Sequence, residues 1–505
     1  MKLLIANRGE IAVRIIRACR EMGLRTVAVY SAVDRMSPHV LMADEAYPVG
    51  PAPAAESYLN VDRLVEVAGR SGAELVHPGY GFLAENAAFA ERVQSEGLVW
   101  VGPPPEAIRT MGSKTAARQL AVKAGAPVIP GLMEPLEDVA ELEAFADEHG
   151  LPLLLKAVAG GGGKGMRTVR RRDELRAAYD RARSEGKAYF GDDRVYVERL
   201  VERPRHVEVQ VIADASGAAV HVGERECSIQ RRHQKVVEEC PSPVVDEDLR
   251  RRMGQSALDI VRASGYHSLG TVEFLLDPEK RFYFLEMNTR LQVEHPVTEM
   301  VYGVDLVIEQ IRLALGKPLS LRQEELIPRG HAIECRVYAE DPLRGFAPSP
   351  GKITSLVRPA GPGVRVDSGV LQGTVVPLEY DPMLAKLVVW AGDREAAVRR
   401  LGRALDEYEV RGIATTLSLF RILVEMDEFR RAEFHTSFLD ELLSSQRLDE
   451  LHRQQDPAAE EAALVAAACL ATEEARRLPT DPYAATEGTG WWSEGVRTQH
   501  GRYPR

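Results

Sequence analysis

Residues 159–166 read AGGGGKGM, and this run of four consecutive glycines constrains the fold more than any other stretch of the chain. Glycine lets a backbone approach a phosphate chain closely and point its N–H groups toward it. The spacing Gly160-x-Gly162-x-x-Gly165 matches the dinucleotide fingerprint G-x-G-x-x-G, whereas Lys164-Gly165 lacks the Ser or Thr of a Walker A loop. The flanking residues must therefore decide which kind of phosphate-binding loop this is.

The segments on both sides of the glycines are predicted to be strands. The apolar run LPLLLKA (151–157) precedes them, and RTVR (167–170) follows with a β-branched centre. A helix is predicted to begin only near Asp173, a good N-cap residue. A dinucleotide site requires a helix N-terminus directly after the glycines, so the order strand, loop, strand excludes it. The sequence instead predicts a glycine-rich hairpin that folds over phosphates as a flap.

The first hundred residues alternate short apolar strands with helices. We expect strands at 2–6, 26–30, 74–77 and 98–102, with a helix after the first strand in which apolar residues recur at helical spacing. This alternation predicts a parallel sheet covered by helices. The turn NRGE after the first strand is no dinucleotide loop, so we expect this domain to be a scaffold that contributes loops to a site.

Length and composition exclude several classes of protein. A chain of 505 residues is too long for one core, and about three or four domains are expected. The formal net charge of −11 argues against nucleic acid as a partner. No apolar stretch reaches the roughly 20 residues that cross a bilayer, so no membrane association is expected. The five cysteines without a C-x-x-C pair, and a first strand that leaves no room for a signal peptide, predict a cytoplasmic protein.

A second hairpin, TVEFLL (271–276), DPEK and RFYFLEMN (281–288), carries two carboxylates. Side chains in a strand alternate with a period of two. If DPEK forms a four-residue loop, Glu273 lies opposite Phe284 and is a diagonal neighbour of Glu286 on the same face.

Asn288 shares that face with Glu273 and Glu286. Two carboxylates and an amide oxygen that converge without a cation would repel each other, and these hard oxygen ligands suit Mg²⁺ or Mn²⁺ held with nucleotide phosphates. The alternative is a solvent-facing strand pair on which like charges are tolerated. The flanking aromatic residues favour the metal site, because they make a fully wet face unfavourable.

Three further stretches contain charged residues that are candidates for the same site. RHVEVQVIAD (205–214) alternates strictly, which places His206, Glu208 and Gln210 on one face of a strand and Val207, Val209 and Val211 on the other. The basic cluster RRHQK (231–235) is a candidate anion site. The loop TRLQVEHP (289–296) would bring Arg290 near the metal–phosphate face, where an arginine can clamp an oxyanion and Glu294 can accept a proton. Taken alone, such an Arg-x-x-x-Glu stretch is more often a surface salt bridge.

Taken together, these stretches resemble the biotin carboxylases, which are ATP-grasp subunits or domains of biotin-dependent carboxylases. The motifs that carry the resemblance are IANRGEIA (5–12), HPGYGFLAEN (77–86), MGSK (111–114), KAVAGGGGKGMR (156–167), RHVEVQV (205–211), QRRHQKVVEE (230–239), EMNTRLQVEHPVTEM (286–300) and ECRVYAED (334–341). They stand in order along residues 1 to about 440. RHQK and the R-x-Q-V-E loop distinguish this family from other ATP-grasp ligases.

The resemblance implies an α/β chain, α+β overall, with an ATP-grasp fold between two other domains. A Rossmann-like parallel-sheet domain precedes it and a mainly β carboxylase domain follows. The implied bounds are 1–112 for the first domain, 113–316 for the ATP-grasp domain with a flap at about 131–203, 330–440 for the C-terminal domain, and 446–505 for a helical, then irregular, tail that is a candidate for partner docking.

The resemblance also implies roles for individual residues. ATP is expected at Lys114, Lys156, Gly162, Gly163, Glu198, Arg199, Leu200, Val201, His206, Gln230, His233, Glu273 and Glu286. The metal is expected on Glu273, Glu286 and Asn288. Bicarbonate and biotin are expected at Lys235, Arg290, Gln292, Val293, Glu294, Arg336 and Tyr80, with Lys235, Arg290, Glu294 and Arg336 in catalytic roles. Tyr80 is equally compatible with a packing role, and Arg199 and Val201 depart from the family's usual Glu-Lys-x-Leu hinge.

The implied reaction is ATP-dependent carboxylation of biotin by bicarbonate through carboxyphosphate, with Mg²⁺ or Mn²⁺. The implied partners are a biotin carboxyl carrier protein, a second copy of the chain and a carboxyltransferase subunit. Two alternatives stay open: another ATP-grasp ligase that forms an acyl or carboxy phosphate, and an inactive nucleotide-binding regulatory protein. The intact lysines and carboxylates disfavour the second. The carboxyl acceptor cannot be read from the chain.

We predict that this chain does not carry its own biotin. Carrier domains present the biotinyl lysine in the pattern Met-Lys-Met, whereas the only Met-Lys here is Met1-Lys2, followed by Leu3. Biotin is therefore expected in trans, on a separate carrier. An avidin blot of the purified 505-residue protein from biotin-replete cells should be blank, and a clear biotinylated band would contradict this expectation.

Overall fold

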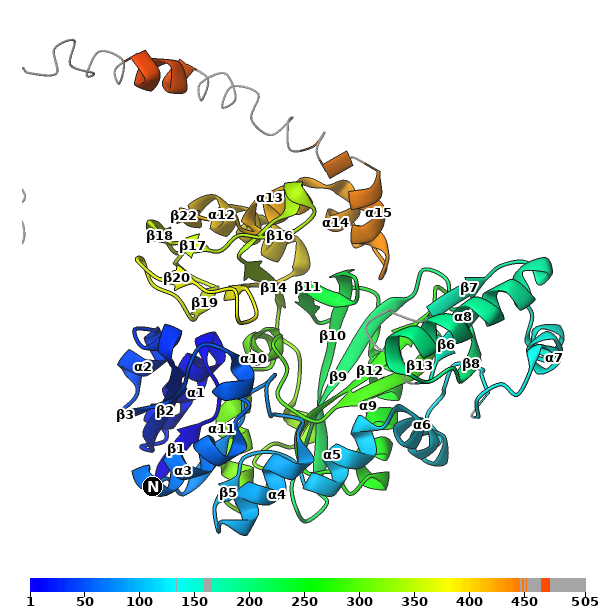
Figure 1. The fold of residues 1–505 in the computed structure, drawn as a ribbon, viewed down its shortest axis with the longest axis horizontal. Helices are drawn as coiled ribbons and strands as arrows, with labels where there is room; N and C mark the ends of the chain where they lie inside the picture. Colours follow the sequence, from blue (N-terminus) through cyan, green and yellow to red (C-terminus); the bar gives the residue numbers. More distant parts are fainter. Residues whose placement is uncertain (133, 159–165, 446, 449–450, 452–464, 473–505) are drawn as a thin grey trace, which may run out of the picture. The chain divides into compact units, whose positions relative to one another are not determined.

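The computed structural model describes residues 1–132, 134–158, 166–445, 447–448, 451 and 465–472 (Figure 1). Gly162 and Gly163 lie outside the described residues, as does most of the predicted tail at 446–505. The chain divides into units of residues 1–448 and 449–505, and the second unit contains a described helix over 465–472. Within these ranges, none of the helices combines the length and apolar character needed to span a bilayer.

The N-terminal region is the predicted parallel sheet. Its strand order is β3-β2-β1-β4-β5, and all neighbours are parallel. The strands are β1 (Lys2–Ile5), β2 (Arg25–Ser31), β3 (Glu45–Gly50), β4 (Leu75–His77) and β5 (Val99–Trp100). Strand β3 was not predicted, because EAYPVG contains Pro48 and is only half-buried.

The strand order reverses between β1 and β4, so the loops after these two strands meet at the carboxyl edge of the sheet. Nδ2 of Asn7 donates hydrogen bonds of 2.7 Å to the carbonyl oxygens of both Pro78 and Tyr80. Helix α1 (Gly9–Glu21) starts directly after the first of these loops and buries its apolar stripe. This edge presents the NRGE turn and Tyr80 toward the rest of the molecule.

An eight-stranded antiparallel sheet occupies the centre, in the order β13-β12-β9-β10-β11-β14-β21-β19. Its strands are β9 (Arg205–Ala213), β10 (Ala219–Arg231), β11 (Gln234–Cys240), β12 (Ser268–Leu276), β13 (Phe282–Asn288), β14 (His331–Tyr338), β19 (Val364–Ser368) and β21 (Met383–Ala391). Because β11 pairs with β14, the sheet runs continuously from the predicted ATP-grasp region into the predicted C-terminal region.

The two faces of this sheet differ in chemistry, as the alternation in 205–214 predicts. Val207 and Val209 pack with Leu249 and Met253 of α9 (Glu247–Ala263) in one hydrophobic core. The opposite face carries His206, Glu208 and Gln210, all of which are buried. A buried face lined with charged groups must pair them internally, and the candidate site forms there.

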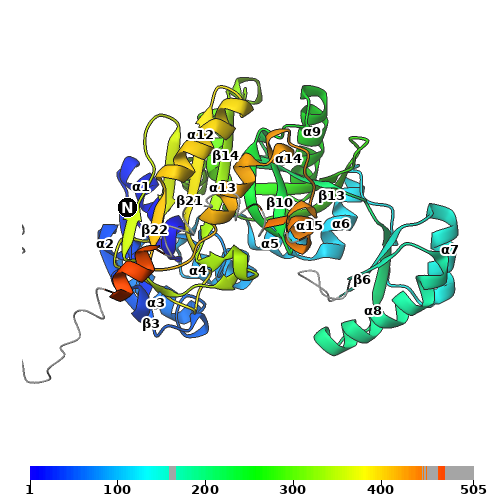
Figure 2. The same cartoon turned by 90° about the horizontal axis from the view of Figure 1, so that it is seen from above.

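The predicted flap is a separate small α/β layer (Figure 2). Its antiparallel sheet has the order β7-β6-β8, from β6 (Leu153–Ala157), β7 (Met166–Val169) and β8 (Val195–Arg199). Helices α7 (Val139–His149) and α8 (Leu175–Phe190) share a hydrophobic core with it. The order strand, loop, strand around the glycines is confirmed.

The start of α8 differs from the prediction near Asp173. A 3₁₀ turn over Arg172–Glu174 comes first, and the helix begins at Leu175. Glu174 accepts hydrogen bonds from the backbone N–H groups of Arg170 and Arg171. This contact tightens the chain before the helix, so Asp173 lies within the turn and does not cap the helix.

The remaining elements complete the layers. The helices are α2 (Pro38–Met42), α3 (Val61–Ser71), α4 (Ala87–Ser95), α5 (Pro105–Gly112), α6 (Lys114–Lys123), α10 (His295–Tyr302), α11 (Leu306–Ala314), α12 (Arg394–Glu407), α13 (Leu417–Glu425), α14 (Asp427–Arg430) and α15 (Phe438–Ser444). The short strands are β15 (Glu340–Asp341), β16 (Ala347–Pro348), β17 (Gly351–Lys352), β18 (Ser355–Val357), β20 (Val375–Val376) and β22 (Glu409–Arg411).

Candidate active site

The β12–β13 hairpin places its two carboxylates closer together than predicted. Glu273 pairs directly with Glu286, and Phe284 pairs with Phe274. The prediction that Glu273 lies opposite Phe284 and diagonal to Glu286 is therefore wrong. A register shift beside Phe274 inserts Leu285 as an extra residue, which is 37% exposed, and so returns Glu286 to the face of Glu273.

The oxygen-rich face of this hairpin fits a divalent cation. Nδ2 of Asn288 donates a 2.7 Å hydrogen bond to Oε1 of Glu273, so these predicted ligands meet. Burial and the charge of Glu273 raise the pKa of Glu286. Among the described residues, the Glu286 side chain has no hydrogen-bonding partner. A largely buried carboxylate beside a second carboxylate, without its own cation, is the environment that Mg²⁺ or Mn²⁺ would relieve.

Lys235 joins this hairpin to the rest of the site. Its Nζ lies 2.5 Å from Oε2 of Glu208, 2.8 Å from Oε1 of Glu273 and 2.7 Å from Oε1 of Glu294. An ammonium group has three donors, and all three are used here. Burial alone would lower the pKa of Lys235, but the three carboxylates raise it well above its usual value. Lys235 is thus a permanent cation shared by two strands, β9 and β12, and the loop before α10.

His206 adds a second positive group beside Glu273. Nε2 of His206 lies 2.8 Å from Oε2 of Glu273. Burial opposes the charge of the imidazole, but Glu273 outweighs it and the pKa of His206 is raised. In turn, although burial would raise the pKa of Glu273, Lys235 and His206 lower it far below its usual range. Glu273 is therefore ionised at neutral pH.

Glu294 is held between two cations. Its Oε1 faces Lys235, and its Oε2 accepts a 2.9 Å hydrogen bond from Nη2 of Arg336. Burial would raise the pKa of Glu294, but Lys235, Arg336 and Arg225 lower it well below its usual value. Nε of Arg336 also donates a 2.6 Å hydrogen bond to Glu238. The structure thus unites Lys235, Glu294 and Arg336 in one buried cluster.

Arg225, which the sequence analysis missed, also belongs to this buried cluster, because it contacts Glu208. The side chain is fully buried, and its guanidinium donates to Glu208 at 2.5 Å, Gln210 at 2.8 Å and Thr298 at 2.9 Å. Arg225 neutralises Glu208 from the side opposite Lys235. The run GERE (223–226) could have revealed Arg225, because charged residues inside a buried strand must be paired.

Arg290 lies at the edge of the cluster and is oriented by a residue that was also missed. Nε of Arg290 lies 2.9 Å from Oε2 of Glu85, and its Nη2 donates a 3.2 Å hydrogen bond to Oδ1 of Asn288. The same Glu85 carboxylate accepts from the backbone N–H of Thr289. Glu85 belongs to the HPGYGFLAEN motif, in which the sequence analysis considered only Tyr80.

The loop between Arg290 and α10 is fixed at its backbone. Gln292 is buried, and its carbonyl oxygen contacts Nδ1 of His295 at 2.8 Å. The carbonyl oxygen of Val293 accepts a 2.8 Å hydrogen bond from Nζ of Lys386. Tyr80 is partly buried and packs against a hydrophobic core that contains Ile5 of β1 and Leu291 of this loop.

The residues predicted to hold ATP lie on several elements. Lys156 of β6 is paired with the buried Glu198 of β8. Arg199 ends β8, Leu200 and Val201 follow it, and the N–H of Leu200 donates to the carbonyl of Pro152. This contact ties the predicted hinge to the start of β6.

Three other predicted ATP ligands lie elsewhere. Lys114 starts α6, and its charge acts on Glu286. Gln230 pairs with Lys235 across β10 and β11. His233 is exposed in the turn between those strands with φ of +67°. Across the part of the chain that the structure describes, no hydrogen bond connects His233 to the other predicted residues.

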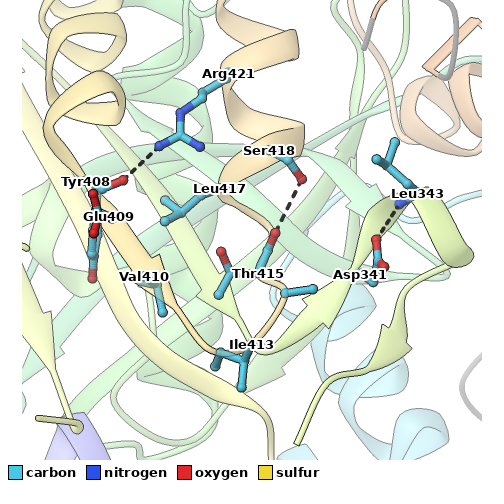
Figure 3. A pocket seen from close by; sticks show the side chains of 11 residues that line it. Asp341, Leu343, Tyr408, Glu409, Val410, Ile413, Thr415, Leu417, Ser418 and Arg421 are labelled. Atoms are coloured by element: carbon cyan, nitrogen blue, oxygen red, sulfur yellow. Dashed lines mark hydrogen bonds between the residues drawn. The ribbon is translucent and has the colours of Figure 1, made fainter. Parts of the chain in front are cut away.

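A cavity of about 310 Å³ in the C-terminal region contains none of the predicted residues (Figure 3). It lies among β22, α13 and the segment around Asp341 and Leu343. Arg421 on its wall donates to the carbonyl oxygens of Leu405 and Tyr408, so its guanidinium serves the end of α12. The buried charges of the central sheet remain the candidate active site.

Three family models match this chain. The family model for the biotin carboxylase N-terminal domain matches residues 1–108, and the model for its C-terminal domain matches 334–441. Between them, the ATP-binding domain of the carbamoyl-phosphate synthase L chain matches 113–322.

Similar whole proteins were found among characterised and solved chains. Biotin carboxylase 1 of Bacillus subtilis is 51% identical over 440 residues, which cover 87% of this chain and 98% of that protein. Biotin carboxylase of a Nostoc species is 50% identical over 441 residues, covering 87% and 99%. The solved biotin carboxylase–β-γ-ATP complex from Campylobacter jejuni matches with a TM-score of 0.82 and 45% identity, covering 87% of this chain and 98% of that chain.

A further solved relative carries ligands that bear on the site. The biotin carboxylase domain dimer of Hydrogenobacter thermophilus 2-oxoglutarate carboxylase, in complex with MgADP, ADP and bicarbonate, matches with a TM-score of 0.81 and 45% identity. The match covers 87% of this chain and 97% of that chain.

Because Lys235 is shared by the carboxylates of the cluster, we predict that the loss of unfolding free energy in Lys235→Met becomes smaller as the pH falls. In the wild type, Lys235 lowers the pKa of Glu273 and Glu294, so their stabilisation is present above the unfolded pKa and is lost as the pH falls. Without the ammonium, these carboxylates are buried unpaired and their pKa values rise. The variant should lose about 3–5 kcal/mol at pH 8, as expected for breaking a buried ion pair. Its deficit should shrink toward pH 5 as the carboxylates take up protons.

Chemical denaturation of both proteins between pH 8 and pH 5 measures this difference in unfolding free energy. Lys280→Met is the matched control, because Lys280 is half-exposed and pairs with Asp246 on the surface. The control should lose at most about 1 kcal/mol, with no pH trend. A deficit of Lys235→Met that stays constant or grows on acidification would contradict the role of Lys235.

Proposed function

The chain belongs to the biotin carboxylase family, and we propose how its buried charges carry out the ATP-dependent carboxylation of biotin by bicarbonate. The reaction is ATP + HCO₃⁻ + biotin → ADP + phosphate + carboxybiotin. The observation that carries the proposal is the position of Lys235. This single ammonium contacts Glu273 on the metal-binding face and Glu294 on the bicarbonate loop, so both halves of the reaction meet in one buried cluster.

The hairpin face is the proposed phosphate half. Glu273, Glu286 and Asn288 would hold Mg²⁺, and the solved 2-oxoglutarate carboxylase domain was crystallised with MgADP. When bound, the divalent cation neutralises charge on the phosphate oxygens. Lys114 and Lys156 would bind the same phosphates.

Other parts of the chain complete the proposed nucleotide site. His206, Gln230 and His233 would contact the nucleotide, and Glu198 to Val201 would receive the adenine. Gly162 and Gly163 would close over the phosphates. Closing this flap excludes water from the reacting groups.

The bicarbonate half is the proposed space between Arg290, Glu294 and Arg336, with Gln292 and the Val293 backbone. Arg290 would orient the anion, and Glu294 would accept its proton as it attacks the γ-phosphate. The low pKa of Glu294 works against proton transfer while Lys235 and Arg336 both contact it. An incoming anion that shares these cations raises the basicity of Glu294, so substrate binding itself prepares the base.

Carboxyphosphate would then yield CO₂ and phosphate next to biotin. The released phosphate would remove the N1′ proton of biotin, and the nitrogen would attack CO₂. Arg336 would stabilise the negative charge that develops on the ureido oxygen, because its guanidinium is fixed by Glu238 and Glu294 before biotin arrives. Tyr80 would contact biotin near the N-terminal edge.

A biotin carboxyl carrier is the partner that this family requires. We propose that it is a separate chain, together with a carboxyltransferase subunit. A homodimer is proposed because the solved 2-oxoglutarate carboxylase domain is a dimer. We also propose a cytoplasmic location, because Cys19, Cys227, Cys240 and Cys335 are buried free thiols.

The proposed roles predict different losses in two variants. Arg336→Ala should abolish carboxylation of free biotin more severely than bicarbonate-dependent ATP cleavage, because its charge partner forms on biotin. Glu294→Gln should depress both activities by about 10²-fold or more, since the general base acts before carboxyphosphate forms. ADP release with bicarbonate, with and without free biotin, measures both steps.

Arg250→Ala is the matched control, because Arg250 forms a bidentate pair with Glu224 outside the cluster. This variant should leave both activities unchanged. Equal loss of both activities in Arg336→Ala would remove its proposed role. Wild-type ADP release that responds to neither bicarbonate nor biotin would contradict the proposed function itself.

A further inference from the structure

Lys386 of β21 is fully buried although no part of the proposed reaction uses it. It pairs in register with Arg336 of β14 on one side and with Asp367 of β19 on the other. Cross-strand partners point to the same face of a sheet, so Lys386 shares the face of Arg336. That face lies under the loop that carries Glu294.

The ammonium of Lys386 reaches the loop directly. Its Nζ donates a 2.8 Å hydrogen bond to the carbonyl oxygen of Val293 and lies 5.7 Å from the ring centroid of Tyr80. Val293 is flanked by Gln292 and Glu294. A hydrogen bond to the carbonyl between these residues fixes the peptide plane that leads into Glu294.

Glu10 is the counter-ion of this lysine. Its Oε2 lies 3.3 Å from Nζ of Lys386, with both side chains buried. Burial raises the pKa of Glu10 to about 7, and Lys386 opposes this rise. Glu10 belongs to the start of α1 in the N-terminal region, whereas Lys386 belongs to the C-terminal region. The pair therefore joins two distant parts of the chain beneath the bicarbonate loop.

The start of α1 is packed closely against the C-terminal region. A Cβ atom on Gly369 would lie 2.6 Å from the backbone nitrogen of Glu10, a distance that no side chain could accommodate. The backbone of Glu10 thus lies in close contact with Gly369, which directly follows β19. This contact packs the start of α1 against the strand pair β19–β21 that carries Lys386.

We propose that Lys386 and Glu10 are positioning residues, which hold the Val293 carbonyl so that the Glu294 carboxylate meets bicarbonate in the reactive geometry. The inference rests on the proposed function, because it assigns bicarbonate to this loop. Neither side chain touches the substrate. Lys386 acts through the backbone of Val293, and Glu10 acts by keeping the ammonium in place.

The alternative is an ion pair that only stabilises the fold, and a double variant separates the two roles. Lys386→Met leaves Glu10 buried without its cation, so both stability and positioning should suffer. Glu10→Gln/Lys386→Met removes both charges and should restore much of the melting temperature. The Val293 carbonyl is still without its donor in the double variant, so the kinetic defect should persist.

The experiment measures bicarbonate-dependent ADP formation and melting temperature for each variant. In the double variant, kcat/KM for bicarbonate should fall about tenfold or more, because small misplacements of a reacting group cost this much. The KM for ATP should stay unchanged. Glu10→Gln alone keeps the lysine donor and should show a smaller defect. Glu309→Gln is the matched control for a buried carboxylate away from the site, and it should keep wild-type kinetics.

A double variant with wild-type kcat/KM for bicarbonate would overturn the proposal, whatever its stability. An equal rise in the KM for ATP and for bicarbonate would also overturn it, because a general loss of structure would explain that result. Failure of the proposed function is distinct, since it would appear as absent bicarbonate dependence in the wild type.

Discussion

The contact of one buried ammonium with three carboxylates organises this molecule. Lys235 bonds to Glu208 of β9, Glu273 of β12 and Glu294 of the loop before α10. Burying three carboxylates without a cation would be prohibitively unfavourable, so the sheet and the loop must come together around this lysine. The same contacts lower the pKa of Glu273 and Glu294 and keep both ionised, as their proposed roles of metal ligand and proton acceptor require.

The continuous eight-stranded sheet extends this cluster into a row of charges. Because β11 pairs with β14 and β14 pairs with β21, Arg336 and Lys386 lie side by side beneath the loop that carries Val293 and Glu294. Arg336 contacts the Glu294 side chain, and Lys386 contacts the Val293 backbone. The loop that carries the proposed base Glu294 is thus held at two adjacent points by the sheet, as catalytic positioning would demand.

Local sequence patterns predicted much of this arrangement, whereas they did not reveal the long-range contacts. The strand order around the glycines, the parallel N-terminal sheet and the shared face of Glu273 and Glu286 come from periodicity and turn residues. The predicted register of the β12–β13 hairpin was wrong, because no periodic pattern reveals the extra residue at Leu285. Glu85, Arg225 and Lys386 were missed, since their roles depend on partners that only the tertiary structure brings near.

In the proposed reaction, the cluster joins a phosphate site to a bicarbonate site so closely that a bicarbonate oxygen attacks the γ-phosphate of ATP. Turnover with ¹⁸O-labelled bicarbonate and biotin, followed by mass spectrometry of the released phosphate, tests this directly. If carboxyphosphate forms and then releases CO₂, the oxygen that bridged carbon and phosphorus stays with phosphate. We predict one ¹⁸O atom per phosphate released. Phosphate that carries only oxygen from ATP and water would contradict a carboxyphosphate intermediate.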